Sequence, residues 1–287
     1  MKGDCMETIY VNRENLCNWQ EKAKPNVMAL GFFDGLHNGH CEVIKTALQE
    51  AKEKKVSLAV MSFFPHPKTV ISNGKKQVCY LMPPSEKEEM LRLLGVDTFY
   101  FVEFDMEFAS LSPEEFVAKY LIHLGVVHAV AGFDFSYGYK GTGHMDRLKS
   151  DSGGRIEVTK VAKVECQGEK ISSTCIRERL LKGNVEELPA FLGRPYEVKC
   201  DWDGFSFNLN SYYTLPAPGR YSVTLKQGMR SIESEMIVME DQEGHSLKST
   251  IKIPLFMKGK ISIVWHRCIL EDNVQTHDVR NLMVSSR

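Results

Sequence analysis

The sequence predicts an α/β fold in which a parallel sheet with covering helices is followed by a small antiparallel β-barrel or sandwich. Over the first two thirds of the 287 residues, short apolar runs alternate with segments of helical periodicity. Repeated strand–helix units imply right-handed crossovers and a parallel sheet that binds ligands outside the carboxyl ends of its strands. After residue 196 the apolar segments become short and partly alternating. We therefore expect two domains, at residues 1–190 and 191–287.

Continuous apolar runs predict the buried strands of the first domain. These runs occupy residues 27–30, 56–63, 98–104 and 126–131. In the second domain, turns that contain Gly, Pro, Asp or Asn separate shorter segments with partial alternation, which is typical of antiparallel strands. These strands are expected at 220–225, 233–239, 247–253 and 260–265.

Helices of the first domain are predicted from spacing and from capping residues. Apolar residues recur at helical spacing over 43–51, so a helix follows the first strand. Ser85 and Glu88 have the spacing of a capping box at the start of a second helix. The segment 112–115, Ser-Pro-Glu-Glu, combines an N-cap with proline at the first helical position. It predicts a third helix that extends through Leu124.

Composition indicates an ordinary soluble enzyme. The formal net charge is −1, so we expect no general attraction to nucleic acid or to an anionic membrane. The eight cysteines form no C-x-x-C pair and no zinc-like cluster, which indicates reduced thiols. The N-terminus is polar and charged, and no apolar run reaches the length of a signal peptide or a membrane span. We expect a cytoplasmic monomer or small homo-oligomer with small-molecule ligands.

The segment 31–40 lies where the first strand turns into a helix and reads Gly-Phe-Phe-Asp-Gly-Leu-His-Asn-Gly-His. Glycines let the backbone approach a ligand closely, and the unpaired N–H groups of a helix start attract phosphate. His37 and His40 add movable hydrogen-bond donors. A single histidine beside a helix start is usually a cap or a surface group. Two histidines that bracket a glycine directly after a strand favour a phosphate site instead.

Two aromatic segments follow other strands. Residues 63–67 read Phe-Phe-Pro-His-Pro, so prolines fix the backbone on both sides of His66. A flat ligand ring could stack there, but a rigid turn with core phenylalanines explains the segment equally well. Residues 132–143 form a glycine-rich loop in which three exposed aromatic side chains surround Asp134. Such side chains are costly to leave in water, so this loop is expected to face a ligand rather than to be only a surface loop.

A third segment, residues 171–177, places hydroxyl side chains at a helix start and reads Ile-Ser-Ser-Thr-Cys-Ile-Arg. The Ser-Ser-Thr sequence alone is simply a good N-cap. Arg177 emerges within the first turn of this helix and adds a planar and permanently charged fork.

The H-x-G-H element at 37–40 resembles the signature of the nucleotidyltransferase superfamily, and the chain more specifically resembles the bacterial FAD synthetase family. Five segments carry this resemblance in the family's order: 31–40, 64–67, 132–143, 171–177 and 192–196. Bifunctional members of the family join an FMN adenylyltransferase domain to a riboflavin kinase barrel. The resemblance implies a Rossmann-like nucleotidyltransferase domain that transfers AMP from ATP to FMN, with FAD and pyrophosphate as products. Mg²⁺ would accompany ATP, with no metal ligand assigned to the protein.

The resemblance also implies roles for individual residues. His37, His40 and Arg177 would act on the ATP phosphates, the histidines as hydrogen-bond donors rather than as acid–base groups. The ATP pocket would be lined by Gly31, Phe32, Phe33, Asp34, Gly35, Gly39, Gly132, Asp134, Gly138, Ser172, Ser173 and Thr174. The flavin would lie beside Phe64, His66, Pro67, Phe135 and Tyr137.

Departures from the family pattern affect both domains. Cys175 stands where the family usually has arginine, which removes a positive charge near the phosphates, and Cys41 stands where glutamine is common. After residue 196 there is no Pro-Thr-Ala-Asn motif, whose Thr and Asn hold metal and phosphates in the kinase. The segment 215–221 still resembles the family's strand lead-in. We therefore expect a shortened barrel that keeps its scaffold, lacks the family's final helix and has lost the kinase site.

Two other functions stay open at this point. Another adenylyl- or cytidylyltransferase of the superfamily would share the H-x-G-H element, but the segment 65–67 and the aromatic loop at 133–139 favour a flavin. A non-catalytic flavin or nucleotide sensor would agree with the altered barrel and with Cys175. The intact H-x-G-H element argues against it, because a binding module has no need of pyrophosphate contacts.

Overall fold

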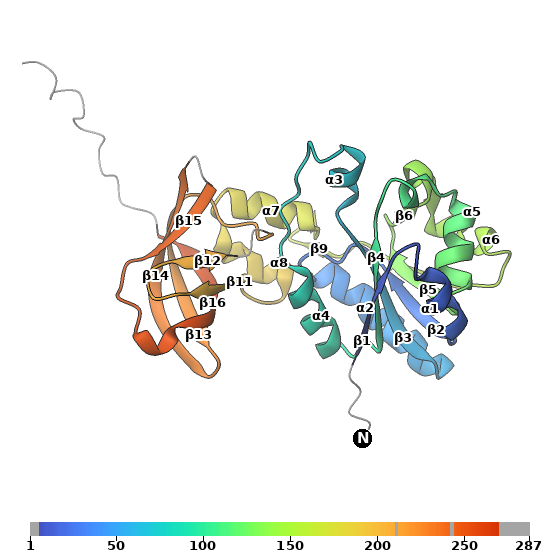
Figure 1. The fold of residues 1–287 in the computed structure, drawn as a ribbon, viewed down its shortest axis with the longest axis horizontal. Helices are drawn as coiled ribbons and strands as arrows, with labels where there is room; N and C mark the ends of the chain where they lie inside the picture. Colours follow the sequence, from blue (N-terminus) through green and yellow to red (C-terminus); the bar gives the residue numbers. More distant parts are fainter. Residues whose placement is uncertain (1–5, 210–211, 242–243, 270–287) are drawn as a thin grey trace, which may run out of the picture.

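The chain forms two domains that lie side by side, with helices α7 (Ser173–Leu181) and α8 (Leu188–Leu192) between them (Figure 1). The computed structural model describes residues 6–209, 212–241 and 244–269. The first domain is a parallel sheet with a hydrophobic core on each face, and the second is an antiparallel sheet. The α/β class that the sequence predicts is confirmed.

The parallel sheet has six strands in the order β1-β4-β3-β2-β5-β8. All neighbouring strands run parallel, which requires a crossover between each pair that is consecutive in the chain. The four strands predicted for this domain form within one or two residues of their expected bounds. The strands are β1 (Glu7–Val11), β2 (Asn26–Leu30), β3 (Ser57–Phe64), β4 (Thr98–Glu103), β5 (Val126–Gly132) and β8 (Glu157–Val161).

Helices cover both faces of this sheet because side chains alternate along each strand. Val27 and Ala29 of β2 join the core beneath α2 and α4, whereas Met28 and Leu30 join the core on the opposite face. Each face of the sheet is therefore covered by its own set of helices. The helices are α1 (Leu16–Lys22), α2 (Asn38–Lys54), α4 (Pro84–Leu93), α5 (Pro113–Phe116), the π-helix η2 (Val117–Ile122) and α6 (Met145–Asp151).

The capping box expected from Ser85 and Glu88 is wrong. Helix α4 begins at Pro84 with Pro83 as its N-cap, and no side chain caps it. The two prolines preset the backbone for a helix start, so the N-cap lies at Pro83, two residues before the expected Ser85. Glu88 instead accepts a hydrogen bond from the Tyr10 hydroxyl at 2.5 Å.

The third predicted helix begins as expected but ends differently. Ser112 and Glu115 cap each other reciprocally at the start of α5, which confirms the predicted N-terminus. The helix then continues as the π-helix η2 and ends at Ile122, so the expected extension through Leu124 is two residues too long. Within one helix the hydrogen-bonding pattern changes, and apolar periodicity does not report such a change.

The strand order opens a crevice near the middle of the sheet. The chain passes from β2 to β3 and β4 on one side and then returns to β5 on the other side of β2. In open parallel sheets, ligands bind at such a switch point, outside the carboxyl ends of the strands. The segment 31–40 follows β2 and the loop 132–143 follows β5, so both lie at this crevice.

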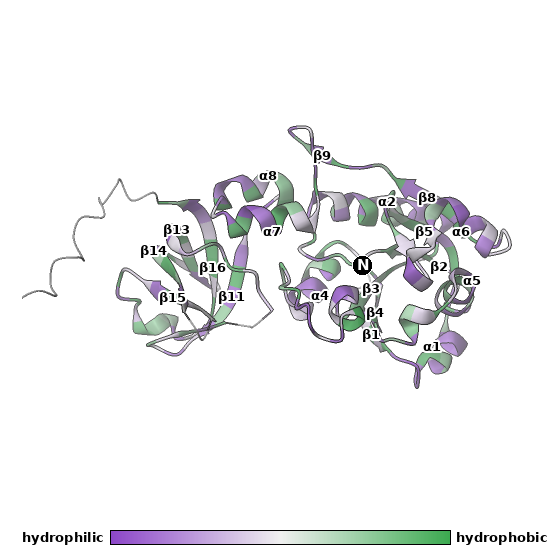
Figure 2. Cartoon of the chain, turned by 90° about the horizontal axis from the view of Figure 1, so that it is seen from above, coloured by the Kyte–Doolittle hydropathy of each residue, from purple (hydrophilic) through white to green (hydrophobic). Residues whose placement is uncertain are grey.

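The second domain is a nearly closed antiparallel barrel. Its sheet has the order β12-β11-β16-β13-β14-β15, and the edge strands β12 and β15 contact each other. Hydrophobic and hydrophilic residues are interspersed along its strands (Figure 2), as in β13, where Tyr221, Val223 and Leu225 are buried. The strands are β11 (Glu197–Trp202), β12 (Phe207–Leu209), β13 (Gly219–Gln227), β14 (Arg230–Asp241), β15 (Gly244–Ser249) and β16 (Gly259–Cys268).

Of the four strands predicted for the barrel, one is displaced. The strand expected at 247–253 ends at Ser249. The N–H of Thr250 still donates to the Glu235 carbonyl at 3.0 Å, and the Ser249 hydroxyl then donates to the Ile251 carbonyl at 2.9 Å, where the chain turns away from β14. The expected absence of a final helix concerns residues 270–287, which lie outside the described residues.

Helices α7 and α8 pack on the core of the barrel rather than on the parallel sheet. Ile176 and Leu180 are fully buried in the same cluster as Tyr221 and Trp265 of the barrel. The N–H of Ala217 also donates to the Leu180 carbonyl at 2.8 Å. The hydroxyl segment at the start of α7 is therefore held in place by the second domain, although it precedes residue 190 in the chain.

Three further observations concern the described part of the chain. Its seven cysteines are free thiols. Within the same ranges, no helix is long and apolar enough to cross a membrane. No group of three or more His, Cys, Asp or Glu side chains in these ranges is placed to hold a metal ion.

Candidate active site

A cavity of about 710 Å³ lies at the crevice of the parallel sheet. Its wall comes from the ends of β2 and β5, the start of α2, the start of the short helix α3 (Pro67–Ile71) and the start of α7. The structure thus brings together segments that are far apart in the sequence. The lining residues that the sequence had singled out are Gly31, Phe32, Phe33, His37, Gly39, His40, His66, Pro67, Gly132, Asp134, Phe135, Tyr137, Gly138, Ser172, Ser173, Thr174 and Arg177.

The two histidines of the H-x-G-H element stack on each other at the start of α2. His37 is the N-cap, and its Nδ1 accepts a hydrogen bond from the backbone N–H of His40 at 3.2 Å. The two rings are nearly parallel, with centroids 3.6 Å apart and planes inclined by 15°. Gly39 makes room for this pair, because a Cβ at that position would lie 3.3 Å from the His37 ring.

Both histidines are neutral near pH 7. Burial lowers the pKa of His37 to about 4, and the charges of Lys170 and Arg194 act in the same direction. Burial also lowers the pKa of His40 well below its ordinary value. Since Nδ1 of His37 accepts a hydrogen bond, we assign the ring proton to Nε2, which can donate to a ligand. Nδ1 of His40 is buried and has no hydrogen-bond partner among the described residues.

The hydroxyl segment forms the N-terminus of α7, as predicted. Ser172 is the N-cap, and its Oγ accepts a hydrogen bond from the Cys175 N–H at 3.2 Å. The Ser173 hydroxyl donates to the Asp34 carbonyl at 2.8 Å, which joins α7 to the segment 31–40. Cys175 does not line the cavity; its side chain packs into the core shared with the barrel. Its sulfur therefore completes a helix cap and faces the core, not the cavity.

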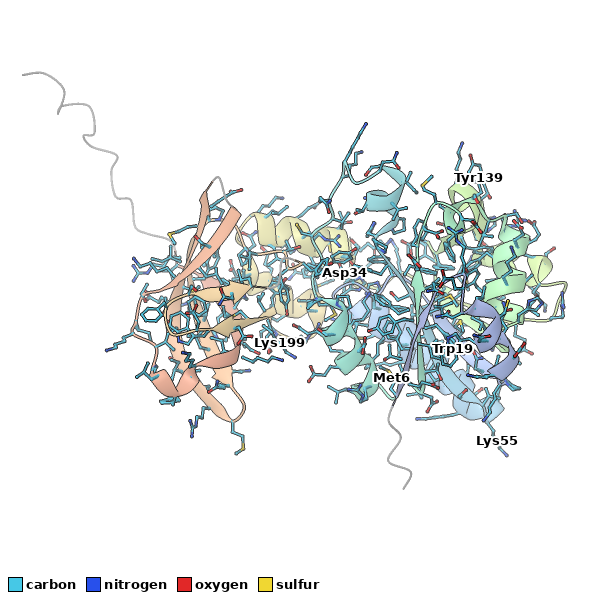
Figure 3. The ribbon with its side chains drawn as sticks, viewed as in Figure 1. Met6, Trp19, Asp34, Lys55, Tyr139 and Lys199 are labelled. Carbon is cyan, nitrogen blue, oxygen red and sulfur yellow. The ribbon has the colours of Figure 1, made fainter. Side chains whose placement is uncertain are left out.

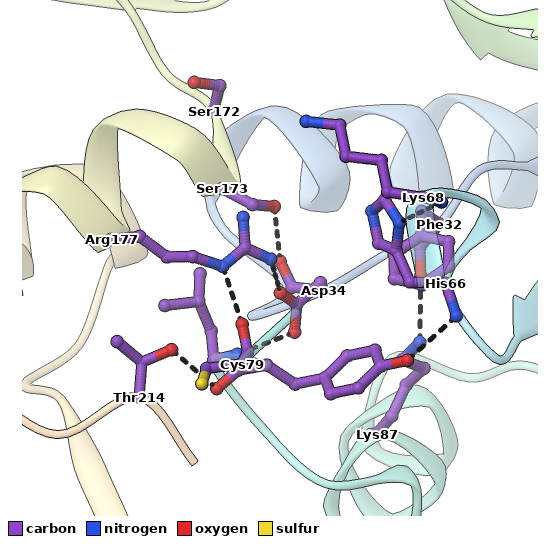
Figure 4. A network of polar contacts seen from close by, with 12 residues as sticks. Phe32, Asp34, His66, Lys68, Cys79, Lys87, Ser172, Ser173, Arg177 and Thr214 are labelled. Carbon is purple, nitrogen blue, oxygen red and sulfur yellow. Dashed lines mark hydrogen bonds and ion pairs between the residues drawn. The ribbon is translucent and has the colours of Figure 1, made fainter. Parts of the chain in front are cut away.

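Asp34 turns away from the cavity and forms a buried ion pair with Arg177 (Figure 4). Its side chain is 1% exposed, and it also accepts a hydrogen bond from the Leu81 N–H at 2.9 Å. Nε of Arg177 donates to the Cys79 carbonyl at 2.9 Å. Burial raises the pKa of Asp34, and the charges of Arg177 and Lys87 oppose this rise. Asp34 lies between the two domains (Figure 3), so the ion pair holds α7 against the parallel sheet.

Asp34, Gly35 and Phe64 were expected in the ligand pockets, but none of the three lines the cavity. The Leu81 side chain covers Gly35, where a Cβ would come within 2.6 Å of it. On β3, Phe63 lines the cavity, and the next side chain, Phe64, packs into the core on the other face of the sheet. Strand alternation explains this difference, because successive side chains point to opposite faces.

His66 and Phe32 form an aromatic corner of the cavity. Their rings meet edge to face, with centroids 4.5 Å apart. Nδ1 of His66 accepts the Lys68 N–H at 3.1 Å, and the backbone N–H of His66 donates to the Tyr80 hydroxyl at 2.9 Å (Figure 4). Burial lowers the pKa of His66 to about 4. The corner is therefore uncharged near neutral pH.

The loop 132–143 does not expose all of its aromatic side chains. Phe133 is 41% exposed and Tyr139 is 50% exposed, but Tyr137 is 5% exposed. The Tyr137 hydroxyl donates to Asp151 at 2.6 Å, which gives the buried phenol its polar partner. The expectation of three exposed aromatic residues around Asp134 is therefore wrong, because Phe133 and Tyr139 are exposed whereas Phe135 is half-buried and Tyr137 is buried at the cavity wall.

Several cations of the cavity were missed in the sequence. Lys68, Lys140, Lys163 and Lys170 line it, and Lys170 forms an ion pair with Asp134. Lys170 directly precedes the hydroxyl segment, so its position offered a signal. The other three lie in loops or short helices, where no spacing rule distinguishes a ligand-facing lysine from a solvated one.

Two more cations hold the segment 31–40 from outside the cavity. Lys87 donates to the Phe32 carbonyl at 2.8 Å, and Arg194 donates to the carbonyls of Gly35 at 2.8 Å and Leu36 at 3.2 Å. Lys87 occupies an inward position of α4, and a lysine at a core position was a detectable signal. Arg194 belongs to the segment 192–196, which carried the family resemblance but was given no role in the site.

Comparisons with known proteins agree with this geometry. A family model described as FAD synthetase matches residues 19–175. The chain is 42% identical over 256 residues to the bifunctional riboflavin kinase/FMN adenylyltransferase of Listeria monocytogenes, covering 83% of this chain and 81% of the relative. It is 34% identical over 196 residues to a FAD synthetase of the same organism, covering 68% and 79%. A solved structure named as a macrolide-efflux protein from Streptococcus pneumoniae matches with a TM-score of 0.79 and 26% identity, covering 96% of this chain and 94% of that chain.

The family match includes the segments that build the cavity. Residues 19–175 contain the H-x-G-H element, the aromatic corner, the loop 132–143 and the first residues of α7. The bifunctional relative extends the likeness into the barrel. The chain therefore belongs to the FAD synthetase family.

Proposed function

We propose that this protein is an FMN adenylyltransferase, which transfers AMP from ATP to FMN and yields FAD and pyrophosphate. One observation carries the proposal: the N-termini of two helices meet at one cavity. Gly39 and His40 begin α2, Ser173 and Thr174 begin α7, and all four line the cavity. Unpaired N–H groups and the helix dipole favour phosphate at such ends. The name of the 42% identical relative supports the same activity.

The reaction needs neutralised charge rather than a general base. The terminal phosphate of FMN is largely a dianion near neutral pH, because the second pKa of a phosphomonoester is about 6. One of its oxygens forms a bond to the α-phosphorus of ATP, and the bond from that phosphorus to the bridging oxygen breaks. Pyrophosphate leaves with the electron pair. The site must bring two polyanions together and stabilise charge on the leaving group.

Neutral histidines suit this role. With the ring proton on Nε2, His37 offers a hydrogen bond to a phosphate oxygen, and the stacked His40 ring, which also lines the cavity, offers a second one. Arg177 contributes positive charge at the wall of the cavity, although two of its donor groups are used by Asp34 and Cys79. On the opposite helix start, Ser172 and Thr174 supply hydroxyl groups, and Ser173 and Thr174 supply backbone N–H groups, because the Ser173 hydroxyl is used by Asp34.

Flat rings fit the aromatic part of the cavity. We assign the flavin to the corner of Phe32, His66 and Pro67, together with Phe135 and Tyr137 of the neighbouring loop. The nucleotide side is assigned to Gly31, Phe33, Gly132, Asp134 and Gly138. Phe64 plays no direct part, because it packs on the other face of the sheet.

Mg²⁺ is proposed to enter with ATP. Among the described residues, Asp134 is the one carboxylate that lines the cavity, and it pairs with Lys170. Such a donor set fits an ion held by phosphate oxygens and water rather than by a protein cage. Bound in this way, Mg²⁺ would neutralise part of the charge on the phosphates. The free cysteines and the small-molecule cavity agree with a cytoplasmic enzyme that acts on soluble metabolites.

The barrel is proposed to lack riboflavin kinase activity. No Pro-Thr-Ala-Asn sequence follows residue 196, so the Thr and Asn that would hold metal and phosphates have no counterpart. The lead-in at 215–221 is used for packing instead: the Tyr221 hydroxyl donates to the Ala217 carbonyl at 2.7 Å, and Tyr221 is buried against Trp265. The core of the barrel still buries the apolar face of α7.

A chromatographic assay tests the proposal. The purified chain is incubated with Mg²⁺ and four substrate pairs: FMN with ATP, FMN with CTP, riboflavin with ATP, and FMN without nucleotide. FAD should form from FMN and ATP, and no FMN or FAD should form from riboflavin. A cytidine product would indicate another nucleotidyltransferase, and flavin binding without turnover would indicate a sensor. FMN made from riboflavin, in a preparation free of other kinases, would refute the loss of the kinase site.

A further inference from the structure

Lys87 is a buried lysine directly behind the segment 31–40. Lys87 lies on the inward face of α4 and is 3% exposed. Its ammonium donates to the Phe32 carbonyl at 2.8 Å and to the Ser62 hydroxyl at 3.1 Å (Figure 4 shows Lys87 and Phe32). The same nitrogen lies 5.1 Å from the centroid of the Phe32 ring and 5.6 Å from that of the Phe101 ring. Lys87 itself does not line the cavity, but Phe32 does.

The charge of Lys87 is not fully compensated. No carboxylate of the described residues lies within ion-pair distance of it, and Asp34, whose charge acts on it, is already paired with Arg177. Two cations therefore share one buried carboxylate. Burying an unpaired ammonium is costly, so a lysine at this position needs a compensating function or partner. Anionic phosphates brought to the cavity would be such a partner.

Lys87 can act on the site through two routes. By holding the Phe32 carbonyl, it fixes the turn that leads from β2 to His37, and it shares this carbonyl with the Ser62 hydroxyl at 2.7 Å. By its charge, it helps to keep His40 and His66 neutral. The charged or titratable groups that face it are Asp34, His40 and His66, with Arg177 behind Asp34.

We propose that Lys87 is a positioning residue for adenylyl transfer, which fixes Phe32 and supplies positive charge behind the loop where the phosphates of ATP bind. This inference rests on the proposed function. It assigns to Lys87 two separable contributions, a hydrogen bond and a charge. The hydrogen bond survives deprotonation, because a neutral amine still donates to a carbonyl, whereas the charge does not.

The pH dependence separates these contributions. Burial lowers the pKa of Lys87 to about 8. The phosphates of FMN finish titrating below that pH, with a second pKa of about 6. In the free enzyme, kcat/KM for ATP should therefore fall as pH rises through about 8, since this parameter reports ionisations of free enzyme and substrate. The fall should occur with no loss of folded protein.

Three variants complete the experiment, with kcat/KM for ATP measured between pH 7 and pH 9.5 and folding checked by thermal denaturation. Lys87→Met should lose roughly tenfold or more at pH 7.5, about 1.4 kcal/mol, and should show no further fall at alkaline pH. Lys87→Arg should keep activity at pH 9.5, because its charge persists. Ser62→Ala is the matched control: it removes a neutral donor from the same carbonyl and one acceptor of Lys87 but leaves the ammonium charge, so it should cost less and keep the alkaline fall.

Each outcome supports or overturns the inference. A wild-type profile that is flat from pH 7.5 to pH 9.5, or an alkaline fall that persists in Lys87→Met, would refute the role of the charge. Equal losses in Lys87→Met and Ser62→Ala would leave only a structural hydrogen bond. If Lys87→Met does not fold, the wild-type and Lys87→Arg profiles decide the question. Failure of the wild type to form FAD at any pH would instead refute the proposed function.

Discussion

Replacing Arg177 with methionine should destabilise the protein as well as slow it. The substitution removes the partner of Asp34, whose side chain is 1% exposed, and leaves a carboxylate in the core between the domains. Breaking a buried ion pair by removing one partner typically costs about 3–5 kcal/mol. Asp34 keeps the Leu81 N–H and the more distant charge of Lys87, so we expect about 3 kcal/mol, at the lower end. With an unfolding entropy of about 2.1 cal/mol/K per residue, this corresponds to a fall in Tm of roughly 5 °C for 287 residues.

The cost should depend on pH in a defined direction. Burial already raises the pKa of Asp34, and loss of Arg177 should raise it further. A carboxyl group with a raised pKa in the folded state contributes most stability when it is protonated, and this contribution is lost as pH rises through its folded-state pKa. The difference in Tm between Arg177→Met and the wild type should therefore be larger at pH 8 than at pH 5.

Thermal denaturation followed by circular dichroism measures this effect. Arg220→Met is the matched control, because Arg220 also pairs with a carboxylate, Glu235, but both side chains are about two-fifths exposed at 40% and 38%. An exposed pair contributes about 0–1 kcal/mol, so the control should change Tm little. Equal shifts for the two variants, or a shift that does not change with pH, would refute the buried ion pair as a link between the domains.

Three further predictions concern catalysis and domain structure. His37→Ala and His40→Ala should each lower kcat by roughly 10²–10³ with little change in the Kd for FMN, and turnover at the wild-type rate would remove the phosphate role of that histidine. Arg194→Met should lower kcat/KM for ATP about 10- to 100-fold, because the carbonyls of Gly35 and Leu36 lose a charged donor; an unchanged value would contradict this role. A chain that ends at residue 190 should fail to give soluble, active enzyme because α7 loses its core, and FAD formation by such a chain would show that the barrel is dispensable.

The fold was predictable because its signals are local. Continuous apolar runs marked four of the six parallel strands, and alternation between turns marked four of the six barrel strands; β1, β8, β11 and β12 were missed. Errors arose where residues next to the expected boundary of a helix changed its start or its hydrogen-bonding pattern. Two prolines moved the start of α4 ahead of Ser85, and a change to π-helical bonding shortened the helix that follows Ser112. Neither effect alters the arrangement of the sheet.

The site was predictable to the extent that its groups lie in continuous segments. The H-x-G-H element and the hydroxyl segment each place several groups at one helix start, so sequence order was enough to find them. The direction of a side chain was not predictable in the same way. Asp34 turns to the guanidinium of Arg177 on α7, and Lys87 and Arg194 reach the loop from α4 and from the segment 192–196. Such contacts depend on the packing of distant segments.

The division between the domains also depends on the packing of distant segments, which the sequence pattern does not report. Secondary structure changes from helix to strand between α8 and β11, that is, between residues 192 and 197, whereas the sequence analysis placed the boundary at residues 190 and 191. The hydrophobic core does not divide there, because Ile176 and Leu180 of α7 are buried with Tyr221 and Trp265. Periodicity reports which face of a helix is apolar, but it does not report which neighbour covers that face.

The most direct test of adenylyl transfer at this cavity is the stoichiometry of its products. Purified protein is incubated with FMN, ATP and Mg²⁺, and FAD and pyrophosphate are quantified in the same samples over time. Equal amounts of the two products, formed by the wild type and strongly reduced in His40→Ala, are the expected result. Pyrophosphate without FAD, or no FAD from folded wild-type protein, would contradict transfer of AMP to FMN.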